Sequence, residues 1–338
     1  MLQAKVQAIA QYLPDDVVTN QTLSAVVPTW TAEQLGAKTG IVERRIAAPA
    51  VCSSDLAVAA AQKLFEQGTA NRADIDLLML CTQTPDYFLP TTACMLQDRL
   101  GLPRSCAAFD VNLGCSGYVY GLGLVKAMLQ AEQAKSALLI MAETYSKFMR
   151  PDDISVRAIF GDAATATLLT AEECNTVPLA GSPYAFVYGT DGTGAKNLMV
   201  RYGGMREPSG LGSDERPWLY MNGPEIFTFT LRVVPQLVND ILRRAELDMD
   251  DIDMFLFHQA NGFMLEHLRR KMGVPVDKFV VQLSHCGNTV SSTIPIALQA
   301  AVRSGSLRPG MKVMLVGFGV GYSWGGCLLE WPEKLALL

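Results

Sequence analysis

The feature that most constrains the fold is an internal repeat. Residues 73–80 (ADIDLLML) resemble residues 250–257 (DDIDMFLF), and a predicted helix ending in Gly-Leu-Pro (101–103) or Gly-Val-Pro (273–275) follows each copy. Each copy continues with a strand, a turn of small residues and a second helix, and closes with an apolar strand and a glycine-rich hairpin. Self-similarity of this length predicts two structural halves of the same β-α-β-α-β-β design.

The apolar runs of both halves are typical of strands buried on both faces, because Leu, Met, Val and Ile follow one another without alternation. These runs cover residues 77–81, 137–141, 254–257 and 313–316. Helical periodicity lies between them, at residues 54–66, 94–100 and 118–130. Alternating strands and helices predict a layered α/β fold. We place the two halves at residues 1–175 and 176–338, and interpret residues 172–216 as a connection with a surface excursion.

Composition excludes several classes of function. The 338 residues carry a formal net charge of −5, whereas nucleic-acid-binding proteins usually carry a basic surplus. No uninterrupted apolar stretch approaches the roughly 18 residues of a membrane span. Polar residues interrupt the N-terminal segment 1–16, which argues against a signal peptide. We therefore expect a cytoplasmic protein that binds neither nucleic acid nor membrane.

Cysteine and histidine give no indication of a metal site. The eight cysteines include no C-x-x-C pair, and most lie in apolar surroundings, which predicts reduced, buried thiols. The three histidines are His258, His267 and His285, and none has the ligand spacing that a zinc site requires. We expect no metal and no bound cofactor.

The first candidate for chemistry is Cys115, in a turn of small residues between a predicted strand and a predicted helix (FDVNLGCSGY, 109–118). A thiol at a helix N-terminus faces the positive end of the helix dipole and unpaired backbone N–H groups. Both favour the nucleophilic thiolate. Taken alone, the same position also suits one more buried cysteine.

Three further segments carry candidate residues that could act together with Cys115. His258 directly follows an apolar strand, where the active sites of parallel sheets collect, although a structural histidine also fits there. Asn288 lies in the turn that takes the place of Cys115 in the second half, and could donate to an oxyanion or cap a helix. The glycines of residues 317–321 (GFGVG) let backbone N–H groups approach a ligand, as an oxyanion hole requires.

In this order, the four features resemble the thiolase superfamily, and specifically β-ketoacyl-[acyl-carrier-protein] synthase III. The resemblance extends over nearly the whole chain. Its further motifs are Thr39-Gly40-Ile41, Glu43-Arg44, Phe160-Gly161-Asp162, 222–227 (NGPEIF), 258–261 (HQAN), Gly287-Asn288-Thr289 and 317–326. The resemblance implies a five-layered αβαβα sandwich built from two duplicated halves. It also implies a homodimer whose substrates are thioesters of coenzyme A or of an acyl carrier protein.

The resemblance implies a role for each site residue. Cys115 would accept the acyl group, and His258 and Asn288 would hold the thioester carbonyl of a malonyl extender while it loses CO₂. The backbone N–H groups of Cys115 and Val320 would form the oxyanion hole. Leu89, on a loop bounded by prolines, would enter the acyl pocket of the partner subunit. The other substrate-binding positions implied are Lys38, Gly223, Phe227 and Asn261.

The predicted reaction is loading of an acyl group on Cys115 and decarboxylative condensation with a malonyl thioester to a β-ketoacyl product. Gln34 and Lys38 stand where members that bind acetyl-CoA carry a tryptophan and an arginine, and Gly262-Phe263 replaces a Leu-Arg pair. These departures favour a specialised synthase, of secondary metabolites or unusual fatty acids, over acetyl-CoA priming. An acyltransferase that moves the acyl group to an O or N nucleophile without condensation stays open. A non-catalytic subunit is disfavoured because Cys115 and His258 are both retained.

Overall fold

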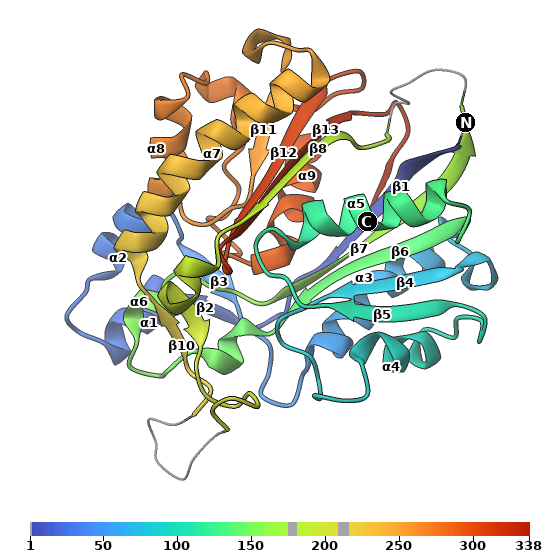
Figure 1. The fold of residues 1–338 in the computed structure, drawn as a ribbon. Coiled ribbons are helices and arrows are strands. Elements are labelled where there is room, and N and C mark those ends of the chain that lie inside the picture. Colours follow the sequence, from blue (N-terminus) through green and yellow to red (C-terminus); the bar gives the residue numbers. More distant parts are fainter. Residues whose placement is uncertain (1, 175–180, 209–215) are drawn as a thin grey trace.

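Two β-sheets form the frame of the molecule, which the computed structural model describes over residues 2–174, 181–208 and 216–338 (Figure 1). The first sheet has the strand order β14-β1-β7-β6-β4-β5, and the second has the order β11-β12-β13-β8. The strands of the first sheet are β1 (Leu2–Tyr12), β4 (Leu77–Cys81), β5 (Ala107–Val111), β6 (Ser136–Glu143), β7 (Ala163–Glu173) and β14 (Ala336–Leu337). Those of the second are β8 (Tyr184–Thr190), β11 (Met254–Phe257), β12 (Lys312–Gly319) and β13 (Ser323–Glu330). Two short pairs lie outside both sheets: β2 (Val17–Thr19) with β3 (Glu43–Arg45), and β9 (Leu198–Val200) with β10 (Leu219–Met221).

The two sheets share one pairing pattern. β4 pairs parallel with β6, β6 pairs antiparallel with β7, and β7 pairs antiparallel with β1. β11, β12, β13 and β8 repeat the same three directions in the same order. The internal repeat that the sequence predicts is therefore present in the sheet topology.

The two copies differ at their edges. β5 pairs parallel with β4, whereas the second half keeps a single parallel bridge, between Phe255 and Phe279, where a strand was expected. β8, the counterpart of β1, agrees with the repeat but is a strand where none was expected. It lies inside residues 172–216, which were interpreted as a connection with a surface excursion; for residues 184–190 this interpretation is wrong, because they pair with β13 in the second sheet. β8 is an edge strand with half-buried side chains, and its apolar residues 184–188 (YAFVY) are mostly aromatic rather than mostly Leu and Met, as in β4.

Helices form three layers around the sheets (Figure 1). α3 (Ser53–Glu66) and α4 (Thr92–Arg99) cover the outer face of the first sheet, and α5 (Gly117–Gln130) and α9 (Thr293–Arg303) lie between the sheets. α7 (Gly223–Ala245) and α8 (Gly262–Lys271) cover the outer face of the second sheet, which confirms the αβαβα order. The shorter helices are α1 (Asn20–Val26), α2 (Ala32–Thr39) and α6 (Ile154–Arg157). None of the helices in the described part of the chain combines the length and the apolar composition that crossing a bilayer requires.

Strand β4 shows why a strand between two layers of helices can be apolar at every position. Leu77, Met79 and Cys81 belong to the buried cluster between the two sheets. Leu78 and Leu80 belong to the cluster beneath α3 and α4. Because successive side chains point to opposite faces, a strand covered on both sides has no position that faces solvent.

The cysteines agree only in part with the prediction of reduced, buried thiols. All eight lie in the described ranges, and none forms a disulfide. Five are buried, but Cys94 is exposed and Cys52 and Cys174 are only partly buried. Cys94 lies in the first turn of α4, next to the residues that this helix buries, so its side chain points away from the core.

Candidate active site

Cys115 lies in the turn between β5 and α5, and its side chain is 7% exposed. Gly319, at the end of β12, packs directly against it: a Cβ atom added to Gly319 would lie 2.7 Å from the Cys115 Sγ. Any other residue at position 319 would therefore displace the thiol. Ser116 fixes the turn through a 2.6 Å hydrogen bond between its hydroxyl and that of Ser323. Strands of the second sheet thus position a cysteine that belongs to the first half.

Burial dominates the electrostatics of Cys115. It raises the pKa of the thiol to about 12, although the backbone N–H groups of Val320 and of Cys115 itself face the sulfur and favour its charged form. The sequence predicted that the helix N-terminus would favour the thiolate, but loss of solvation outweighs these donors. The resting side chain is therefore a neutral thiol beside two backbone donors.

His258 directly follows β11, and its backbone N–H donates to the carbonyl of Val316 at 2.7 Å. The ring is 1% exposed and stands edge-on to Phe318, with the ring centres 5.7 Å apart. Its Nδ1 lies 2.7 Å from the hydroxyl of Thr293. Burial lowers the pKa of the imidazole to about 3, so the ring is neutral at physiological pH.

Asn288 faces His258 with its amide nitrogen. The Asn288 Oδ1 accepts a 2.9 Å hydrogen bond from the backbone N–H of Val290, which turns Nδ2 into the site. Nδ2 lies 3.5 Å from the His258 Nε2 and 3.3 Å from the carbonyl oxygen of Ala260. The carbonyl of Asn288 accepts a 3.0 Å hydrogen bond from the N–H of Gly161, which joins this turn to the first half.

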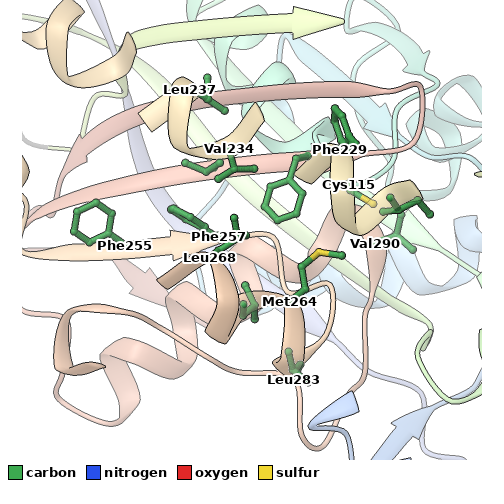
Figure 2. Close-up of a cluster of buried hydrophobic side chains, with 14 of the residues drawn as sticks. Cys115, Phe229, Val234, Leu237, Phe255, Phe257, Met264, Leu268, Leu283 and Val290 are labelled. Carbon is green, nitrogen blue, oxygen red and sulfur yellow. The ribbon is translucent and has the colours of Figure 1, made fainter. Parts of the chain in front are cut away.

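The three residues that the sequence singled out converge on the end of β12. Cys115 packs on Gly319, the backbone of His258 bonds to the same strand, and Asn288 reaches the imidazole. Figure 2 shows Cys115 and Val290 among the side chains of the buried cluster between the second sheet and helices α7 and α8. Within the described ranges, no group of three His, Cys, Asp or Glu side chains is placed to hold a metal ion. The functional groups at this site are a thiol, a neutral imidazole and an amide.

Other residues of the sequence motifs stabilise the structure around this site. Arg44 is fully buried and donates to the Oδ1 of Asn20 at 2.8 Å and to two backbone carbonyls. A Cβ atom on Gly161 would collide with the carbonyl of Cys286, in the turn that leads to Asn288. Glycine at position 161 therefore lets the two halves approach closely beside the site.

Comparison with known proteins agrees with this geometry. Residues 109–192 match the family 3-oxoacyl-[acyl-carrier-protein] synthase III, and residues 242–331 match the C-terminal family of the same synthases. The β-ketoacyl-[acyl-carrier-protein] synthase III of Clostridium perfringens is 35% identical over 98% of this chain and 100% of the relative. This chain belongs to the β-ketoacyl-[acyl-carrier-protein] synthase III family.

Solved structures of these synthases share the fold. A 2.1 Å crystal structure of a 3-oxoacyl-(acyl-carrier-protein) synthase III is 49% identical, with a TM-score of 0.93 over 97% of this chain and 100% of that one. The corresponding synthase of Burkholderia xenovorans LB400 is 35% identical, with a TM-score of 0.90 over 100% of this chain and 98% of that one. The protein is therefore an acyltransferase of the synthase III type, with the thiolase-like fold that the sequence predicted.

Four of the predicted substrate-binding residues lie at adjoining helix ends. Lys38 is in the last turn of α2, and Gly223 and Phe227 are in the first turns of α7. Asn261 caps α8, because its Oδ1 accepts a 2.8 Å hydrogen bond from a backbone N–H of the first turn. Both α2 and α7 contact α8. The fifth residue, Leu89, lies on the loop between β4 and α4 and is 81% exposed.

Trp30 is a neighbour of this region that the sequence did not indicate. The ammonium group of Lys38 lies 4.4 Å from the centre of the Trp30 ring, a cation–π contact. Gln34, where the sequence resemblance implies a tryptophan in members that bind acetyl-CoA, is used in a helix cap: its Oε1 accepts a 2.9 Å hydrogen bond from the N–H of Thr31. Only the path of the chain between α1 and α2 brings the Trp30 ring to Lys38, so no local pattern could reveal the contact.

A buried carboxyl group near the site was also missed. Glu143, the last residue of β6, is fully buried and accepts hydrogen bonds from the N–H of Gln83 (3.1 Å), the hydroxyl of Thr84 (2.9 Å) and the hydroxyl of Ser291 (3.3 Å). Burial raises the pKa of Glu143 to about 8. These bonds tie the loop after β4 to the turn that carries Asn288. An acidic residue that ends an apolar strand gives no sign in the sequence that it is buried.

The raised pKa of Cys115 predicts how its alkylation depends on pH. Because the thiolate is the reactive form and the pKa is about 12, the rate of reaction with iodoacetamide should rise steadily through the neutral and alkaline range. Intact-mass spectrometry with peptide mapping measures this rate, and the Cys115→Ala variant gives the contribution of the other thiols. A plateau reached near neutral pH would show a stabilised thiolate and contradict the expectation.

Proposed function

We propose that this synthase loads an acyl group on Cys115 and condenses it with a malonyl thioester, releasing CO₂ and a β-ketoacyl product. The observation that carries the proposal is the convergence of a buried thiol, a neutral imidazole and an oriented amide on the end of β12. A thiol is both a good acyl acceptor and a good leaving group, and two uncharged donors suit a developing enolate. The kinetics should be ping-pong.

In the loading half-reaction, the Cys115 sulfur attacks the carbonyl carbon of the donor thioester. A new C–S bond forms as the donor's C–S bond breaks, and the cysteine proton leaves with the donor thiol. The N–H groups of Cys115 and Val320 would bind the oxygen anion of the tetrahedral intermediate, since both face the sulfur. Because the resting thiol is neutral, loss of its proton has to accompany the attack.

In the condensing half-reaction, His258 and Asn288 would donate Nε2–H and Nδ2–H to the thioester carbonyl of the malonyl group. The bond to CO₂ breaks, and its electron pair forms an enolate whose oxygen the two donors stabilise. The enolate carbon then attacks the Cys115 thioester. A C–C bond forms, and Cys115 leaves as a thiolate that takes up a proton.

Transfer of the acyl group to an O or N nucleophile would retain the same residues. That reaction needs a base to remove the proton of the nucleophile, and burial makes His258 a weak base by lowering its pKa to about 3. This observation favours condensation. The test is release of CO₂ from a carboxyl-labelled malonyl thioester added to the acylated enzyme, whereas acyl transfer without CO₂ would support the alternative.

We also propose a donor other than acetyl-CoA, and hence a specialised pathway. Lys38 is engaged with Trp30 and Gln34 with a helix cap, so neither side chain reproduces the tryptophan and arginine associated with acetyl-CoA. Intact-mass measurement after incubation with acyl-CoAs of increasing length would identify the donor.

The relatives are named for acyl carrier protein, and we propose the same carrier for the malonyl group here. The absence of disulfides among eight cysteines agrees with a cytoplasmic location.

A homodimer in which each subunit completes the acyl pocket of the other is part of this proposal. The loop between β4 and α4 exposes Tyr87 by 61%, Phe88 by 74% and Leu89 by 81%. Apolar side chains on a loop tip of this kind normally have a partner to cover them. β5 contacts the helix that follows this loop and is an edge strand, with no strand of the described ranges on its outer side. A second copy would cover both features.

Replacing Leu89 by tryptophan is expected to shift the enzyme toward shorter acyl donors, because the larger side chain would fill part of the partner's pocket. The measurement is the rate of Cys115 acylation over a series of donors, while reactivity with iodoacetamide should stay unchanged. Tyr87→Trp, on the same loop, is the matched control and should leave the profile as it is. An unaltered profile in Leu89→Trp, or a monomer in sedimentation at micromolar concentration, would count against the shared pocket.

A further inference from the structure

The imidazole of His258 lies between two hydrogen-bonding neighbours. On one side, Nδ1 is 2.7 Å from the Thr293 Oγ1. On the other side, Nε2 is 3.5 Å from the Asn288 Nδ2. The Thr293 hydroxyl is also 3.0 Å from the carbonyl oxygen of Val290, to which it donates in this structure. Thr293 has one hydroxyl proton and two acceptors within reach, so it can satisfy only one of them at a time.

The acceptor to which the Thr293 hydroxyl donates determines whether the His258 Nε2 is a hydrogen-bond donor or an acceptor. When Thr293 donates to Val290, it can only accept from the imidazole, so Nδ1 carries the ring proton and Nε2 is a bare acceptor that faces the Asn288 amide. When Thr293 donates to Nδ1 instead, the ring proton is on Nε2. The ring holds one proton in both arrangements. Only the second makes His258 and Asn288 two converging donors.

Asn288 cannot compensate for the wrong arrangement. Its Oδ1 accepts from the N–H of Val290 at 2.9 Å, so the amide always presents nitrogen to the site. Val290 holds this geometry with a φ of +55°, a left-handed conformation that is rare for a β-branched residue. Protonation of the ring does not compensate either, because burial lowers the pKa of His258 to about 3. The position of a single proton therefore decides whether the pair can stabilise an enolate.

We propose that Thr293 is a positioning residue for decarboxylation, whose hydroxyl donates to the His258 Nδ1 when a malonyl thioester binds and so keeps the ring proton on Nε2. This inference rests on the proposed function. The carbonyl of the bound thioester accepts from both Nε2 and the Asn288 amide, so it favours this arrangement over the one in the empty site. An equivalent dependence on histidine tautomer is known in serine proteases, where a carboxylate holds the ring.

The Thr293→Val variant tests this role because valine keeps the shape of threonine and removes the hydroxyl. The carbonyl of Val290 is then the remaining acceptor near Nδ1, which favours the Nδ1–H tautomer. Condensation should fall by about 10- to 100-fold, less than the roughly 10²–10³-fold expected when a donor is removed altogether. Acylation of Cys115 should not change, and Thr293→Ser should restore condensation.

Thr230→Val is the matched control. Thr230 is also fully buried, and its hydroxyl has no hydrogen-bond partner among the described residues, so its loss should leave both half-reactions unchanged. ¹⁵N NMR of the histidine side chains, with a non-decarboxylating malonyl thioester analogue bound, gives the second readout. His258 should carry its proton on Nε2 in the wild type and on Nδ1 in Thr293→Val.

The outcomes separate this inference from the proposed function. If the wild type releases no CO₂ from malonyl thioesters, the proposed function fails and the inference fails with it. If the wild type condenses normally, three results would each overturn the inference alone: full condensation by Thr293→Val, equal loss in both half-reactions, or an unchanged tautomer. Selective loss of condensation in Thr293→Val, with recovery in Thr293→Ser and the predicted tautomers, supports it.

Discussion

Replacing Cys115 by alanine is expected to abolish acylation of the protein while its other cysteines remain in place. The substitution removes the thiol that packs on Gly319 and faces the N–H of Val320. Intact-mass spectrometry after incubation with a suitable donor should show the acyl mass on the wild type and none on the variant. Cys106→Ala is the matched control, because Cys106 is 8% exposed against 7% for Cys115 but belongs to the cluster beneath α3 and α4.

The control variant should keep full labelling. Loss of labelling in both variants would indicate a general effect of removing a buried thiol. A mass shift that persists in Cys115→Ala would place the acyl group on another residue and refute the assignment of the nucleophile.

Alanine at His258 or at Asn288 is expected to slow condensation far more than loading. In the proposed mechanism, both side chains stabilise the enolate, which forms only after Cys115 carries its acyl group. Each loss should lower the condensation rate by roughly 10²–10³-fold, as for removal of one oxyanion donor. Single-turnover experiments with pre-acylated enzyme separate the two half-reactions. His285→Ala, at a histidine whose side chain is 69% exposed, is the control and should leave both rates unchanged.

An equal loss of loading and condensation in these variants would have a different meaning. It would show that His258 or Asn288 acts on the Cys115 thiol, as in a catalytic dyad, rather than on the malonyl group.

The interior of the fold is the part that the sequence predicts best. The expected strands at 77–81 and 254–257 agree to the residue with β4 and β11. These two strands are covered on both faces and are apolar at every position, so their limits coincide with the apolar runs. Edge elements are predicted less well. β8 was missed although residues 184–188 are all apolar, and the strand expected near Phe279 is reduced to a single bridge, because edge pairing depends on tertiary contacts.

The candidate site was predicted through family resemblance more than through local chemistry. The structure places Asn288 beside His258 and Cys115 against Gly319, but the neighbouring residues Thr293 and Glu143 were not foreseen. Glu143 receives its hydrogen-bond partners from segments far away in the chain, and a residue type in sequence does not reveal such partners.

The protonation state of the Cys115 thiol also could not be predicted from local sequence. The helix terminus beside Cys115 is a local feature, and it predicts a stabilised thiolate. Burial reverses this prediction, and Gly319, in the second half, packs directly against the sulfur. The electrostatic balance at the site therefore depends on contact between the two halves, which no local pattern records.

One measurement tests the central claim most directly, by following a single acyl group through both half-reactions. The enzyme is acylated on Cys115, freed of excess donor and mixed with a malonyl thioester labelled in its carboxylate. We expect equal amounts of labelled CO₂ and β-ketoacyl product, and return of the enzyme to its unmodified mass. Loss of the acyl group without CO₂ release, or CO₂ release with the acyl group still on Cys115, would contradict decarboxylative condensation at this site.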